Sequence, residues 1–130
     1  MNDIKVTIGG RELPLRYSFN ALCEMEAALG AGRPALRVIA EMGDMRWRDL
    51  RALLWAGALH DPKAPSLSEV GVLVNAELEA AKHVADGHRK LYARLYEAVS
   101  DALIRGGVVQ SPDAVVAEDP AGNAEAATAP

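Results

Sequence analysis

Apolar residues stand at every second position in two short segments near the start of the chain. This is the period of a half-buried β-strand, whose side chains alternate between two faces. Gly9 and Gly10 separate the two segments, and such a pair supplies the positive φ angles of a tight turn. We therefore predict a β-hairpin with strands over about 3–8 and 11–17. Because a lone hairpin is barely stable, it must pack on a helix or pair with another chain.

Beyond this hairpin the apolar positions follow the helical spacing of three and four residues. Ser18 is a suitable N-cap for a first helix that ends at Gly30, and Ser66 with Glu69 forms a capping box for a later one. Gly87 falls inside the last helical segment and marks either a kink or a boundary between two helices. The pattern predicts further helices over 34–42 and 46–60, one that starts near 67, and a strongly helical segment over 76–105.

The apolar stripes of these helices also predict a core. Half of the residues are hydrophobic, which is enough for the core of one domain. The expected core positions are Leu22, Met25, Leu29, Leu36, Ile39, Leu50, Leu53, Leu54, Leu73, Leu91, Leu95 and Val99. The fold class that follows is mainly α, with four to five helices and an N-terminal β-hairpin.

The last part of the chain differs in composition from the rest. From Val108 onward there are no aromatic and no basic residues, and alanine, proline and acidic residues dominate. Such a segment buries too little apolar surface to offset the entropy of ordering it. We therefore predict one helical domain over residues 1–107 and a disordered acidic tail over residues 108–130.

Charge and cysteine content exclude several functional classes. Asp113, Glu118, Asp119 and Glu125 account for the whole net charge of −4, so the predicted domain is neutral. A neutral body lacks the basic face that sequence-independent binding of nucleic acid requires. No apolar run approaches the roughly 20 residues that cross a bilayer, and the first residues do not read as a signal peptide. A single cysteine fits a reducing compartment, so we expect the protein to work in a cytoplasm.

We find no pattern of catalytic or metal-binding residues in the sequence. His83 and His88 are five apart, whereas a helical zinc pair is spaced by four residues. His60 beside Asp61 is better explained as a histidine at a helix end than as a general base. Glu24 and other nearby acids oppose formation of a thiolate, so we expect Cys23 to be a small core residue. The sequence therefore indicates a protein that is not an enzyme and that uses no cofactor or metal.

Aromatic side chains at helical positions are candidates for a contact surface. Trp47 and Trp55 are eight apart and share one side of a helix, either as core anchors or as contact residues, because tryptophan is enriched in binding hot spots. Basic residues accompany Trp47 and the two tyrosines of the last helix, but ordinary solvated helix faces have the same composition. The residues that we expect at or near a partner groove are Phe19, Glu26, Trp47, Trp55, Tyr92 and Tyr96.

Two segments of the chain resemble a known family. The segment 15–30 fits the pattern L-x-(Y/F/T)-(S/T)-F-x-A-L-x-x-(I/M/L)-E-x-x-L-G through Leu15, Tyr17, Ser18, Phe19, Ala21, Leu22, Met25, Glu26, Leu29 and Gly30. A second region fits the pattern aGL-loop-S-x-E-E-V of the same family through Ala56, Gly57, Ala58, Leu59, Ser66, Glu69 and Val70. It departs from the pattern at Ala58, where a second glycine is common, and at Gly71. Over about residues 4–105 the chain resembles the tail assembly chaperones of long-tailed phages, in the group shared with gene transfer agents and sometimes labelled tail tube protein.

The resemblance implies a role and partners. A chaperone of this kind binds the tape measure protein in the cytoplasm of the bacterial host while the tail tube protein polymerises, and tube subunits then displace it. Two other classes stay open: a structural tail tube or connector subunit, and a small helical regulator that binds DNA. A tube subunit needs several long strands, and the sequence indicates two; a regulator needs a basic recognition helix, and none stands out. Self-association of the chain is left open.

Overall fold

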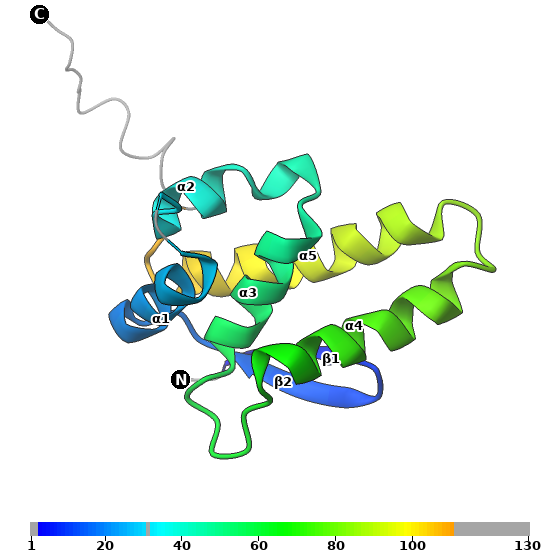
Figure 1. Cartoon of the computed structure of the whole chain (residues 1–130), viewed down its shortest axis with the longest axis horizontal. Coiled ribbons are helices and arrows are strands. Elements are labelled where there is room, and N and C mark those ends of the chain that lie inside the picture. Colours follow the sequence, from blue (N-terminus) through cyan, green and yellow to red (C-terminus); the bar gives the residue numbers. More distant parts are fainter. Residues whose placement is uncertain (1–2, 31, 111–130) are drawn as a thin grey trace, which may run out of the picture.

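An antiparallel hairpin is followed by five α-helices in the computed structural model, which describes residues 3–30 and 32–110 (Figure 1). The elements are β1 (Ile4–Ile8), β2 (Arg11–Leu15), α1 (Phe19–Leu29), α2 (Ala35–Ala40), a 3₁₀ turn η1 (Met42–Asp44), α3 (Trp47–Gly57), α4 (Leu67–Ala81) and α5 (Gly87–Arg105). This architecture confirms the predicted fold class. The expected acidic tail lies outside the described residues from position 111 onward, so the domain boundary at 107 stays a prediction.

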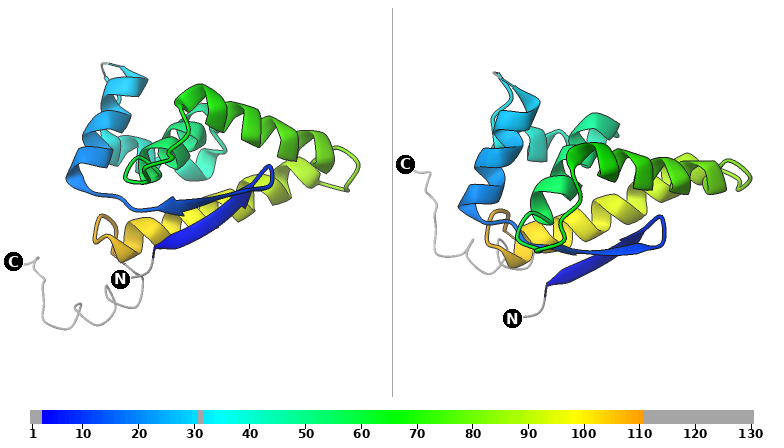
Figure 2. Two further views of the ribbon diagram at one scale, coloured as in Figure 1. Left: turned by 90° about the horizontal axis from the view of Figure 1, so that it is seen from below. Right: turned by 60° about the horizontal axis from the view of Figure 1, so that its bottom comes forward.

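The hairpin turns at Gly9 and Gly10, whose φ angles are +59° and +81°. Both are positive, as the tight two-residue turn requires, and the register pairs Ile4 with Leu15 and Ile8 with Arg11. One face of the hairpin is buried through Val6, Ile8, Leu13 and Leu15. β1 packs on α4 and α5, which supply the apolar support that an isolated hairpin lacks (Figure 2).

Helix α3 lies at the centre of the molecule, with α1, α4 and α5 packed around it (Figure 1). Leu50, Leu53 and Leu54 are almost completely buried, which confirms their expected place in the core. Directly after β2, the backbone N–H of Arg16 donates to the carbonyl of Gly57 at the end of α3 at 2.8 Å. The hydroxyl of buried Tyr17 donates to the carbonyl of Leu53 at 2.6 Å, and burial raises the pKa of this tyrosine.

The segment 76–105 is not one helix. Helix α4 ends at Ala81, the chain reverses, and α5 begins at Gly87 after Asp86 adopts a left-handed conformation with φ +58°. Gly87 therefore marks a boundary, which was one of the two predicted outcomes. Its backbone lies against that of Ala81, so that a Cβ at position 87 would overlap the Ala81 carbonyl oxygen. The resulting α4–α5 hairpin extends to one side of the molecule (Figure 2).

Two expected core positions are wrong. Leu36 is 65% exposed, because α2 turns Ala35 and Val38 inward instead, and Met42 of η1 joins them in the core. Cys23 is exposed, because α1 buries the side that carries Ala21, Met25 and Leu29. In both short helices the apolar residues spread around more than one face, so the sequence pattern alone did not specify which face turns inward.

The capping box of α4 provides a simple test of the fold. The Ser66 hydroxyl oxygen accepts from the backbone N–H of Glu69 at 3.1 Å, and the Glu69 carboxylate accepts from the backbone N–H of Ser66 at 2.7 Å. We expect Ser66→Ala to lower the free energy of unfolding by about 1 kcal/mol, since a backbone donor loses its partner. Urea denaturation measures the change. The control is Ser68→Ala, which changes an exposed serine one residue inside the helix and should shift stability much less.

Candidate functional site

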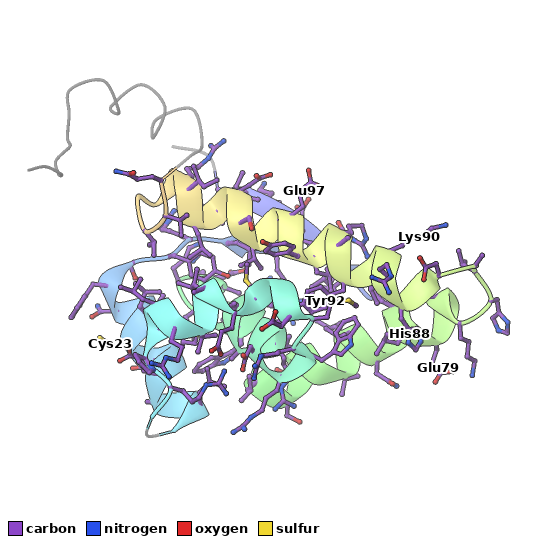
Figure 3. All side chains as sticks on the ribbon, turned by 90° about the horizontal axis from the view of Figure 1, so that it is seen from above. Cys23, Glu79, His88, Lys90, Tyr92 and Glu97 are labelled. Carbon is purple, nitrogen blue, oxygen red and sulfur yellow. The ribbon has the colours of Figure 1, made fainter. Side chains whose placement is uncertain are left out.

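Three of the six expected contact residues form an aromatic cluster. The rings of Trp47 and Tyr92 meet edge to face with centroids 5.0 Å apart, and the ring of Tyr96 lies 6.3 Å from that of Tyr92. Tyr92 is only 2% exposed and points inward from α5 (Figure 3). Its hydroxyl donates to the carbonyl of Met42 at 2.5 Å, and burial raises its pKa. Tyr92 therefore anchors α5 to the connection between α2 and α3, whereas Trp47 and Tyr96 keep exposed edges.

The other three expected contact residues do not join this cluster. Phe19 begins α1 and is 80% exposed, so it is the most accessible large apolar side chain among the described residues. The Glu26 carboxylate accepts from the backbone N–H of Ala35 at 2.6 Å and so fastens the start of α2 to α1. Trp55 is half-buried and packs against the core. Participation of these residues in partner binding stays a prediction.

A groove runs between α3 and α4, and we call it the α3–α4 groove. Its volume is about 450 Å³. It is lined by Trp47, Arg48, Leu50, Arg51, Gly71, Val74, Asn75 and Leu78. A second hollow continues it along α4 to Leu67 and Val72, and shares Arg51 and Gly71 with it. Of the residues expected at a contact surface, only Trp47 lines this groove.

The sequence contains a row of small and apolar residues that lines the groove, but no groove was predicted from it. Leu67, Gly71, Val74 and Leu78 recur at spacings of four, three and four, which places them along one side of α4. Such a stripe looks the same whether a helix turns it toward the core or leaves part of it open. Val70 and Val74 are buried, whereas Val72 is 67% exposed, so α4 is only partly covered.

Arg48 and Arg51 bring positive charge to the α3–α4 groove. Within residues 3–30 and 32–110 neither side chain forms an ion pair, whereas the preceding Arg46 lies 3.8 Å from Asp44 and 4.0 Å from Glu41. The Nε of Arg51 is covered by the protein and has no hydrogen-bond partner among the described residues. A buried donor without a partner costs stability. Because Nε is covered, an acceptor from outside the described chain would have to approach the terminal Nη1 and Nη2 groups of Arg51.

Residues 2–97 match the family model described as phage tail tube protein, GTA-gp10. The chain belongs to this family. The match includes both segments that carry the expected resemblance, and it makes the protein a tail-related protein of the phage and gene-transfer-agent type. Neither a curated protein nor a solved structure matches the chain.

The described part of this tail protein brings together no set of catalytic side chains. Cys23 and His88 lie at opposite ends of the molecule (Figure 3). No group of three or more histidine, cysteine or acidic side chains in residues 3–30 and 32–110 is arranged to hold a metal ion. None of the helices in this part of the chain has both the length and the apolar character to cross a membrane.

His60 belongs to a small polar cluster that joins the N-terminal segment to the loop after α3. Its Nε2 lies 2.9 Å from the Asp3 carboxylate, and the Nε of Arg16 lies 3.1 Å from the same group. Partial burial opposes the charge of Asp3, but the hydrogen bonds from His60 and Arg16 outweigh it and lower the pKa of Asp3. The carboxylate next to His60 is thus Asp3, and Asp61 instead accepts from the backbone N–H of Lys63. The cluster fastens two chain segments together.

Proposed function

We propose that this tail protein acts without catalysis, as an assembly chaperone that holds the tape measure protein in the bacterial cytoplasm while the tail tube forms. The observation that carries the proposal is the α3–α4 groove, which has apolar walls and two arginines that form no ion pair among the described residues. Grooves between helices bind the apolar face of another amphipathic helix. A long helical protein that exposes such an apolar face needs a binding partner that covers the face until its final partners bind.

A structural tail tube subunit is the second candidate. The description of the family, phage tail tube protein, supports this candidate more directly than it supports a chaperone. The fold supports it less, because the described residues contain one sheet with two strands of five residues each. A tube that closes by pairing strands between neighbouring subunits requires a larger sheet. Family membership lends no support to the DNA-binding regulator considered from the sequence.

Co-expression separates the two candidates. The chain is produced with the tape measure protein and the tail tube protein encoded beside it, and the complexes are purified and sized. For a chaperone, we expect the tape measure protein to become several-fold more soluble than when it is expressed alone, with no particle formed by this chain by itself. Rings or tubes of the purified chain in electron micrographs would instead establish the structural subunit. An insoluble tape measure protein, with no complex formed, would contradict the chaperone proposal.

A further inference from the structure

We infer that the α3–α4 groove binds an amphipathic helix of the partner whose apolar stripe includes a carboxylate placed opposite Arg51. The inference rests on the proposed function, because it assumes that the protein binds a helical tail protein. It goes further by naming the surface that is used and the chemistry that the surface recognises.

The dimensions of the groove fit a helix. Together with the hollow that continues it, the groove extends along α4 from Leu67 to Leu78, which corresponds to a length of roughly 16 Å at the helical rise. That length accommodates about three turns of an incoming helix, or two to three apolar contacts at spacings of three and four. Trp47 and Leu78 provide apolar walls at one end, and Leu67 and Val72 at the other.

Arg51 lies between these two apolar ends. Its side chain crosses the open surface of Gly71, where an added Cβ would lie 3.5 Å from the Arg51 Cδ and 3.6 Å from Nη1. These are ordinary van der Waals distances, so the Arg51 side chain lies against the backbone of α4 at Gly71. A carboxylate on the partner helix would accept from the Nη groups of this guanidinium, which forms no ion pair among the described residues. Arg48, exposed at the edge of the groove, adds attraction for the same charge.

The occupant is a partner helix rather than the acidic end of this chain. Both have negative charge, but Pro112, Pro120 and Pro130 leave at most nine consecutive residues without proline in that part of the sequence. Proline ends or kinks a helix, so an uninterrupted helix there would be at most about 14 Å long and shorter than the groove. A hydrated phosphate is also a poor match, because the groove has apolar walls and the predicted domain carries no net charge.

Two variants and two controls test the inference. Arg51→Met removes the charge but keeps the length of the side chain, and Val72→Glu places a charge on the open apolar side of the groove. Lys90→Met and Val84→Glu make the same changes at exposed residues outside the groove, Val84 being 52% exposed. Urea denaturation of all four variants checks that they fold. We expect Arg51→Met to be at least as stable as the wild type, because it removes the donor that lacks a partner.

The binding probe is a set of overlapping 25-residue peptides from the tape measure protein encoded beside this chain, together with a peptide of residues 111–130. We expect the wild type to capture peptides with an apolar helical stripe that contains an acidic residue. Arg51→Met and Val72→Glu should each weaken capture at least tenfold, and the two controls less than twofold. Changing the acidic residue of a captured peptide to glutamine should remove the difference between the wild type and Arg51→Met.

Other outcomes would overturn the inference. Equal capture by the wild type and both groove variants would mean that the peptides bind elsewhere. Stronger binding of the 111–130 peptide, lost in the groove variants, would make the chain's own end the occupant. If no peptide binds while the full-length tape measure protein still co-purifies, the inference is wrong and the proposed function remains. If the full-length protein does not co-purify either, the proposed function fails as well.

Discussion

The free energy of unfolding of the Arg33→Met variant is expected to be about 3 kcal/mol lower than that of the wild type, because loss of one partner of a buried ion pair leaves the other charge buried and unpaired. The Nη2 of Arg33 lies 2.5 Å from the carboxylate of Asp49, and Asp49 is the one buried charged residue in the described part of the chain. Without Arg33, a carboxylate that is 1% exposed would lose its cation. Because Arg33 itself is partly exposed, we expect a value at the lower end of the usual range.

A double variant separates loss of the pair from loss of packing. In Arg33→Met with Asp49→Leu no charge is left buried, so most of the lost stability should return. The matched control is Arg46→Met, whose partners Glu41 and Asp44 lie at the surface and whose loss should cost less than about 1 kcal/mol. Urea denaturation at neutral pH measures all of these variants. Equal losses for Arg33→Met and Arg46→Met would show that burial of Asp49 does not matter.

Gly87→Ala is expected to lower the free energy of unfolding by up to about 3 kcal/mol, the usual upper range for overpacking. The added Cβ would overlap the carbonyl oxygen of Ala81 and would lie 2.9 Å from the carbon of that carbonyl. These are backbone atoms at the end of α4, so relief requires the two helices to move apart. Replacing a glycine inside a helix by alanine normally raises the stability of the protein. The destabilisation expected here is therefore opposite in sign to the change that helix propensity alone predicts.

Gly43→Ala is the matched control for this variant. A Cβ at position 43 would meet no atom within 4 Å, so its stability should change by less than about 0.5 kcal/mol. Thermal or urea unfolding of both variants, followed by circular dichroism, compares them directly. A Gly87→Ala protein as stable as the wild type would mean that the turn between α4 and α5 opens without cost.

The parts of the fold that depend on residues close together in the sequence were predictable from the sequence. The Gly9-Gly10 turn, the Ser18 cap and the Ser66 capping box occur where the pattern placed them, because each depends on residues within a few positions. The central leucines of α3 were predictable for a related reason. Leu50, Leu53 and Leu54 recur at helical spacing on one side of α3, and an amphipathic helix turns its apolar side toward the core.

The chain reversal at Gly87, the outward Leu36 and Cys23, and the open side of α4 depended on the tertiary structure. Each is decided by which neighbour covers a face, and the period of the apolar residues does not contain that information. The same reason explains the candidate site. The sequence grouped aromatic residues by their type, whereas packing buried Tyr92 and placed Arg51 in the groove between α3 and α4 with no ion pair to residues 3–30 or 32–110. The sequence by itself thus determined the hairpin, the helix caps and the family, and the packing of helices decided where the chain reverses and which surface stays open to a partner.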